Sequence, residues 1–131
     1  MLQRNFYLAH MNSIVREASP KSPYVHFNAV GGILELKGRS IPENALDFYK
    51  PLIEWMGEWV KANPAKTEFH VHLEYFNTSS SKCLLDLFRK LEPLGDNATV
   101  LWHYEADDED MLEAGEDYEA ILSVPFRMVK V

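Results

Sequence analysis

The chain has 131 residues, of which 47% are hydrophobic, and its 13 basic and 20 acidic residues give a net charge of −7. This length fits one domain, and this hydrophobic content is enough for a core, which argues against gross disorder. The negative charge argues against nucleic acid or an anionic membrane as the main partner, because both need a positive protein surface. A protein partner or a neutral ligand fits better.

The chain contains a single cysteine, Cys83, which excludes an internal disulfide and a zinc site made of several cysteines. Its place in an apolar helical pattern indicates a buried thiol rather than a nucleophile. The sequence shows neither a signal peptide nor an apolar run long enough to cross a membrane. We therefore expect a cytoplasmic protein without membrane insertion.

The N-terminal part of the chain is mixed in composition and contains turn-forming prolines. We expect residues 1–13 to form a poorly ordered extension and residues 14–131 to form one domain. The first regular pattern consists of two alternating runs, 24–28 and 33–37, on either side of a Gly-Gly pair. Two period-two runs around such a turn predict a β-hairpin.

A helix is predicted after this hairpin. Ser40-Ile-Pro-Glu43 has the spacing of a capping box, and its proline places the cap at Ser40 or one residue later. Apolar residues then recur at helical spacing over residues 45–60. Residues 67–75 alternate and form the clearest strand, with apolar side chains on one face and His70 and His72 on the other.

Four more elements follow in the second half of the chain. They are a helix over 84–91, a strand over 99–104, an acidic helix over 107–118 and a strand within 126–131. The resulting order, ββαβαβαβ, implies right-handed crossovers and a largely parallel sheet. The predicted fold class is α/β: a STAS-like single domain with a mixed sheet, a hairpin edge and helices packed on it.

The stretch Glu74–Lys82 joins the clearest strand to the following helix. It contains one asparagine and four hydroxyl residues, namely Asn77, Thr78, Ser79, Ser80 and Ser81. Only one such residue is needed as a helix N-cap, so Asn77 or Thr78 takes that role and the others are surplus. A phosphate on Thr78 would lie beside unpaired N–H groups at the positive helix end, within one turn of Lys82. The junction therefore suggests a phosphorylation switch.

Other residues raise metal and enzyme hypotheses. Asp107–Asp110 lacks the alternation of a calcium loop, and acidic residues are expected in a first helical turn, so we interpret this run as a solvated helix face. His70 and His72 have a spacing that can ligate zinc, but no third ligand can be assigned, which favours a structural pair of undetermined role. We predict no catalytic residue, metal or cofactor.

Several motifs, taken together, resemble the SiaC family of bacterial regulatory phosphoproteins. They are Gly38-Arg-Ser-Ile-Pro-Glu-Asn44, Phe48-Tyr-Lys-Pro51, Glu74-Tyr-Phe-Asn-Thr-Ser-Ser-Ser-Lys82, Trp102-His-Tyr104, Asp107-Asp-Glu-Asp-Met111 and Gly115-Glu116. The similarity runs from about residue 14 to the end. It implies a STAS-like fold that resembles anti-sigma-factor antagonists.

The resemblance also implies a function. In this family a serine/threonine kinase phosphorylates the threonine of the Asn-Thr-Ser-Ser motif, and a phosphatase reverses the modification. The unphosphorylated form binds and activates a diguanylate cyclase, which links the protein to cyclic di-GMP signalling and biofilm formation. Carried onto this chain, the phosphoacceptor is Thr78, and Asn77, Ser79, Ser80 and Lys82 lie at the partner contact or shape it.

Two alternatives stay open from the sequence. In the first, the protein is a constitutive interaction scaffold in which Thr78 only starts a helix. In the second, it is a small metal-dependent enzyme that uses the histidines or the acidic run, which requires ligands to converge in the fold.

Overall fold

The computed structural model describes residues 11–131. Most of the extension for which we predicted poor order, residues 1–13, therefore lies outside the described residues. Its last three residues contact the body of the domain: the Trp55 Nε1–H donates to the carbonyl of Asn12 at 2.7 Å. The Ala29 N–H likewise donates to Ser13 Oγ at 2.9 Å.

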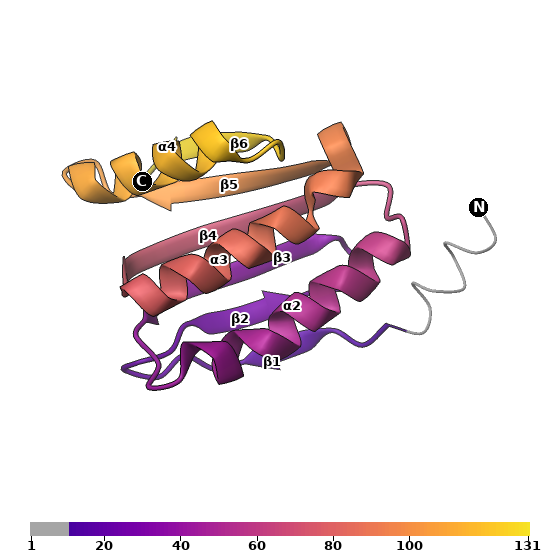
Figure 1. Cartoon of the computed structure of the whole chain (residues 1–131), viewed down its shortest axis with the longest axis horizontal. Helices are drawn as coiled ribbons and strands as arrows, with labels where there is room; N and C mark the ends of the chain where they lie inside the picture. Colours follow the sequence, from indigo (N-terminus) through magenta and orange to yellow (C-terminus); the bar gives the residue numbers. More distant parts are fainter. Residues whose placement is uncertain (1–10) are drawn as a thin grey trace.

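The centre of the fold is a six-stranded sheet in which the strands lie in chain order (Figure 1). Its strands are β1 (Ile14–Arg16), β2 (Tyr24–Phe27), β3 (Ile33–Ser40), β4 (Thr67–Phe76), β5 (Ala98–Tyr104) and β6 (Phe126–Lys130). The first three strands pair antiparallel, and β3 to β6 pair parallel. The predicted α/β class, with a mixed sheet and an N-terminal hairpin, is confirmed.

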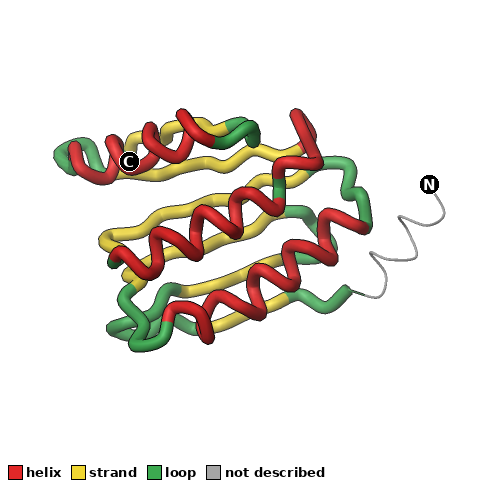
Figure 2. Tube along the Cα trace, viewed as in Figure 1, coloured by secondary structure: helices red, strands yellow, loops and turns green. Residues whose placement is uncertain are grey.

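Three helices connect the parallel strands and lie on one face of the sheet (Figures 1 and 2). They are α2 (Ala45–Lys61), α3 (Thr78–Lys90) and α4 (Glu109–Ile121), and a 3-10 helix, η1 (Glu92–Asn97), follows α3. Each crossover joins neighbouring strands in the same direction. Connections of one hand must therefore place every helix on the same side.

The core fills the space between this helical layer and the sheet. Alternating side chains of the strands point into it, among them Val25, Phe27, Leu34, Leu36, Phe69, Val71, Val100 and Trp102, all at most 1% exposed. The opposite face of the sheet carries polar side chains, among them Glu35, Lys37, His70 and His72. No described helix covers this face (Figure 1). Parallel sheets are usually covered on both faces, so this open face is unusual.

Two details of the fold differ from the prediction. The capping-box prediction at Ser40 is wrong, because Ser40 ends β3 and Asn44 is the N-cap of α2, with Asn44 Oδ1 accepting from the Asp47 N–H at 3.1 Å. Strand β1 was not predicted. It is three residues long, too short for a periodic signal, and it pairs with β2 at the edge of the sheet.

Candidate functional site

The hydroxyl-rich junction lies where β4 ends and α3 begins, at the carboxyl end of the parallel strands. Asn77 is the N-cap: its backbone is extended, and its Oδ1 accepts from the Ser80 N–H at 2.9 Å. Its carbonyl accepts from the Ser81 N–H at 2.9 Å. Of the two candidates for the cap, Asn77 therefore takes the role, and Thr78 becomes the first residue of the helix.

Thr78 is exposed, as are Ser79 and Lys82, whereas Asn77 is half-buried. The Thr78 hydroxyl is not needed for capping, because Asn77 supplies the capping oxygen. The carbonyl of Thr78 accepts a hydrogen bond from Ser81 Oγ at 2.8 Å, which ties the first turn together. The first N–H groups of a helix lack intrahelical acceptors and face outward at its positive end. An anion attached to Thr78 would therefore be locally favoured.

Ser80 differs from its neighbours because it is completely buried. Its Oγ donates to the carbonyl of Ser40 at 3.0 Å and accepts from Ser40 Oγ at 2.8 Å. Ser40 Oγ in turn lies 2.6 Å from the hydroxyl of Tyr49. With Tyr49 as the donor to Ser40, each of the three buried hydroxyls donates one hydrogen bond. Every hydroxyl in this hydrogen-bonded row therefore has a partner. It joins α3, β3 and α2 directly beneath the junction.

A second connection reaches the junction from α4. The hydroxyl of Tyr118 donates to the carbonyl of Ser81 at 2.8 Å. Burial raises the pKa of Tyr49 and of Tyr118 well above the ordinary tyrosine value, so both hydroxyls stay protonated donors. The start of α3 is therefore held by tyrosines of two different helices.

The acidic start of α4 lies beside the same end of the sheet. Asp108 caps the helix, with its Oδ1 accepting from the Met111 N–H at 3.0 Å, and two acidic residues follow in the first turn. A hollow of about 250 Å³ separates this start from the end of β4. It is lined by Glu74, Tyr75, Phe76, Asp108, Asp110, Met111 and Ala114. The surface next to the junction is therefore strongly acidic and contains an aromatic ring, Tyr75, that is 52% exposed.

The open face of the sheet brings together histidines that the sequence did not group. His70 and His72 of β4, predicted as a pair from the sequence, lie beside His103 of β5. Burial, followed by the neighbouring His70 and His72, lowers the pKa of His103. The strand register, which places His103 beside β4, was the missing information. Among residues 11–131, no group of three or more metal-ligating side chains is arranged to hold an ion.

Two further sequence predictions concern burial and membranes. Cys83 is 2% exposed, and burial raises the pKa of its thiol, as expected for a structural rather than a reactive cysteine. Over the described part of the chain, none of the helices has the length and apolar character needed to span a bilayer.

Comparison with known proteins shows to which class and family of proteins this chain belongs. Residues 16–131 match the family model described as SiaC family regulatory phosphoprotein, so the chain is a regulatory phosphoprotein. Because this match covers most of the sequence, the chain belongs to the SiaC family.

Similar proteins of Pseudomonas aeruginosa support this assignment. The fold matches the crystal structure of apo-SiaC with a TM-score of 0.82 and 26% identity, over 91% of this chain and 99% of that one. It also matches a chain in the structure of the diguanylate cyclase SiaD in complex with its activator SiaC, with a TM-score of 0.84 and 25% identity, over 90% and 99% of the two chains. An uncharacterized protein of strain UCBPP-PA14 is 27% identical over 119 residues, which cover 88% of this chain and 94% of that protein.

Proposed function

We propose that this protein is a signalling switch in which reversible phosphorylation of Thr78 controls binding to an output protein, a diguanylate cyclase. A serine/threonine kinase adds the phosphate and a phosphatase removes it. The unmodified form binds and activates the cyclase, and cyclic di-GMP output and biofilm formation follow. The observation that carries the proposal is that Thr78 is exposed at the entrance of α3 while Asn77 supplies the cap. The similar SiaC of P. aeruginosa also supports the proposal, because it is an activator of a diguanylate cyclase.

The physical basis of the switch is a difference in docking cost. A phosphate adds about −1.5 to −2 charges at neutral pH. In the free protein this charge is solvated and lies at the positive end of α3, so the fold tolerates it. Docking would remove the water around this charge and bring it against any acidic group that the partner presents at the contact. Loss of hydration and like-charge repulsion both oppose the complex.

The partner contact is built from the exposed part of the junction. Asn77, Ser79 and Lys82 are half-buried or exposed and are available to a docked protein. Ser80 is buried, so its contribution is to shape the junction from beneath through Ser40. Substitutions of the exposed group are therefore expected to change affinity, and substitutions of Ser80 to change stability.

The test measures phosphorylation and cyclase binding together. Thr78→Ala should bind the cognate cyclase like the unmodified protein and take up no phosphate from the kinase. Thr78→Glu, or the phosphorylated wild type, should bind at least tenfold more weakly, which corresponds to about 1.4 kcal/mol. Intact-mass spectrometry measures the first effect and isothermal titration the second. Phosphatase treatment of the modified wild type should restore its affinity.

Ser79→Ala is the matched control, because Ser79 is an exposed hydroxyl next to Thr78. It should keep full phosphate uptake. If Thr78→Ala still accepts one phosphate per chain, the site assignment is wrong. If the phosphorylated and free forms bind the cyclase equally, the protein is a constitutive scaffold instead.

A further inference from the structure

The helices on the covered face of the sheet differ in charge. Helix α3 carries three basic residues, Lys82, Arg89 and Lys90, against one acidic residue, Asp86, so its net charge is +2. Helix α4 carries six acidic residues and no basic one, and the whole chain has a net charge of −7. Among the helices of residues 11–131, α3 is the one with a net positive charge.

Helical spacing places two of these cations on the same side of α3 as Thr78. Lys82 lies four residues after Thr78, and Arg89 lies seven residues after Lys82, which are separations that bring side chains to one face of a helix. All three residues are exposed. The rise along the helix axis from Lys82 to Arg89 is about 10 Å. A positive stripe, defined by Lys82 and Arg89, therefore begins one turn after Thr78 and ends in the last turn of α3.

The cations of α3 form no ion pair within the described part of the chain, whereas Lys61 of α2 pairs with Glu58 at 3.4 Å. Basic residues in a last turn are expected from the helix dipole, which accounts for Arg89 and Lys90. Lys82 lies in the second turn, toward the positive end of the helix, where the dipole does not favour a cation. Its position therefore has no explanation within α3 itself.

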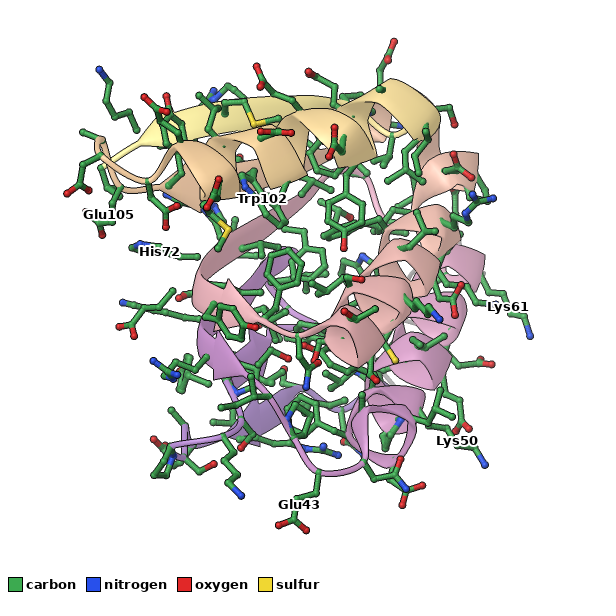
Figure 3. The ribbon with its side chains drawn as sticks, turned by 60° about the vertical axis from the view of Figure 1, so that its left-hand side comes forward. Glu43, Lys50, Lys61, His72, Trp102 and Glu105 are labelled. Atoms are coloured by element: carbon green, nitrogen blue, oxygen red, sulfur yellow. The ribbon has the colours of Figure 1, made fainter. Side chains whose placement is uncertain are left out.

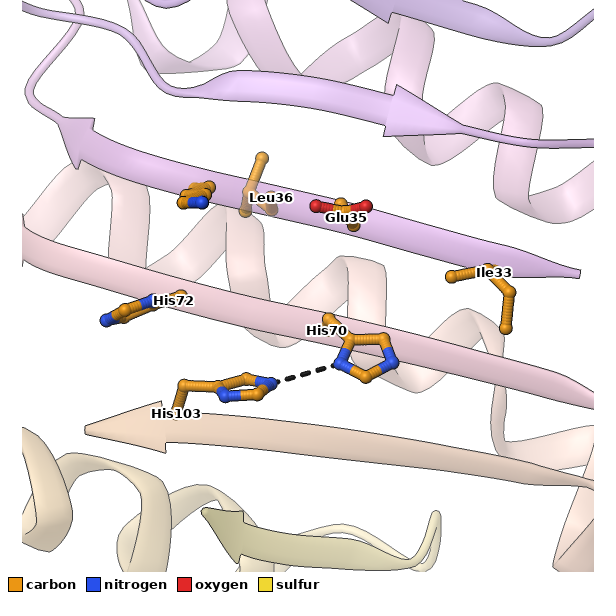
Figure 4. Close-up of a pocket in the computed structure, with 7 residues that line it drawn as sticks. Ile33, Glu35, Leu36, His70, His72 and His103 are labelled. Carbon is orange, nitrogen blue, oxygen red and sulfur yellow. Dashed lines mark hydrogen bonds between the residues drawn. The ribbon is translucent and has the colours of Figure 1, made fainter. Parts of the chain in front are cut away.

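Polar side chains on the opposite face of the sheet behave differently. Figure 3 shows His72 and Glu105 on that side of the molecule. His72 Nε2 lies 3.4 Å from Glu105 Oε1, and His70 Nδ1 lies 3.0 Å from His103 Nε2 (Figure 4). These side chains contact one another, whereas the charged ends of the α3 stripe are directed to solvent and remain available to another molecule.

The stripe borders a hollow on the side of α3 that faces α2. The hollow has a volume of about 470 Å³ and is lined by Ile53, Asp86, Arg89 and Lys90. Ile53 is half-buried and offers an apolar contact, and two of the three charged residues in the lining are basic. A segment that combines carboxylates with an apolar side chain is complementary to this surface.

We propose that an acidic segment of the output protein docks along α3, with its carboxylates on Lys82 and Arg89. This inference rests on the proposed function, because it names the chemistry of that partner. The distribution of charge favours a protein segment over an anionic membrane. A flat anionic surface laid on the helices would also meet the six acidic residues of α4, whereas a narrow segment on the α2 side of α3 avoids them.

The stripe also gives phosphorylation a direct effect on docking. A phosphate on Thr78 adds about −1.5 to −2 charges, which offsets the net charge of +2 on α3. Lys82 lies one turn away, so the phosphate competes with the carboxylates of the partner for this side chain. Phosphorylation thereby removes the positive surface on which the acidic segment docks.

The test is isothermal titration of the full-length, unmodified protein with the cognate cyclase at several NaCl concentrations. Lys82→Gln and Arg89→Gln should each weaken binding about two- to fivefold, as expected for single surface charges. The double change Lys82→Glu with Arg89→Glu should weaken it at least tenfold, because like charges then oppose each other. The affinity of wild type should fall with salt more steeply than that of the double variant. Thermal midpoints show whether each variant is folded.

Lys61→Gln is the matched control, since Lys61 is an exposed cation in the last turn of α2 that is paired with Glu58. It should leave the affinity unchanged. If Lys82→Gln and Arg89→Gln bind like wild type while phosphorylation still weakens binding, this inference is wrong and the proposed switch stands. If both variants bind more weakly but phosphorylation has no effect, the docking surface stands and the switch fails. Phosphatidylserine vesicles that retain wild type but not the double variant would assign the stripe to a membrane and overturn the proposal.

Discussion

Neighbouring hydroxyl residues at the start of α3 have opposite environments. Thr78 is exposed, whereas Ser80 is completely buried in a hydrogen-bonded chain with Ser40 and Tyr49. The residue type is similar, so the difference comes from the rotation of α3 on the sheet. Successive helical residues point about 100° apart, which turns one hydroxyl to solvent and another to the core.

Ser80→Ala should destabilise the domain by about 1–3 kcal/mol, because it leaves Ser40 Oγ buried without its acceptor. Ser79→Ala changes an exposed residue and should stay within about 0.5 kcal/mol of wild type. Urea unfolding followed by circular dichroism measures both. Equal stability of the two variants would show that the buried hydrogen bonds of Ser80 add nothing to the free energy of unfolding.

The sequence could not distinguish these hydroxyls. It predicted the strand-to-helix junction correctly, because the alternating run before it and the apolar helical spacing after it are both strong signals. It grouped Ser80 with the surface residues, since the partner of Ser80 is Ser40, forty positions away in the chain. Contacts of that separation follow from strand register and are not encoded in local spacing.

At the scale of elements, the packing of α4 on β5 depends on one small residue. Gly115 is buried in the middle of α4, and Trp102 of β5 lies directly under it. The indole Nε1–H of Trp102 donates to the carbonyl of Met111, one turn earlier, at 2.9 Å. The helix can approach the strand this closely only because residue 115 lacks a side chain.

Gly115→Ala should therefore destabilise the protein, against the usual preference of helices for alanine. A Cβ there would overlap Trp102 Cδ1 and lie 2.7 Å from its Nε1. Overpacking of this kind costs about 1–3 kcal/mol. Gly57→Ala in α2 is the matched control, because its Cβ would meet nothing within 4 Å, and it should stabilise by about 0.5–1 kcal/mol. Thermal unfolding compares them, and a stabilised Gly115→Ala variant would contradict the proposed contact.

The sequence predicted α4 itself but only part of its contact face. Its acidic start is confirmed, and Met111, Gly115 and Tyr118 form its buried face. The apolar pattern of the sequence does not include Gly115 in that face. A glycine gives no apolar signal, so its role became visible only when Trp102 was found beneath it.

At the scale of the whole molecule, the helices of residues 11–131 lie on one face of the sheet (Figure 2). The other face carries polar side chains. The sequence predicted parallel strands but not their order. Once the strands lie in chain order, a single hand of crossover leaves the second face uncovered. The polar residues of β4, including His70 and His72, had already indicated that one side of this strand is not buried in apolar core.

This open face should make stability depend on pH through His103. Burial and the adjacent His70 and His72 hold the pKa of His103 below its ordinary value, so the unfolded chain binds the proton more readily than the fold does. Above the unfolded value of about 6.5 this difference costs nothing, and stability is lost as pH falls below it. His103→Gln should lose less stability than wild type between about pH 7.5 and 5.5.

Urea midpoints measured at both pH values test this expectation. His26→Gln removes another histidine of the same face and keeps His103, so it should retain the wild-type difference between the two pH values. If His103→Gln retains that difference as fully as His26→Gln does, His103 is not its source.

The agreement between strand order and chain order also bears on how the domain is made. Each strand from β2 onward pairs with the strand translated just before it. A nascent chain can therefore extend its sheet one strand at a time during synthesis, without waiting for a distant segment to emerge from the ribosome. The last strand, β6, closes the far edge, so a protein fused behind it would sit across the whole width of the sheet from β1.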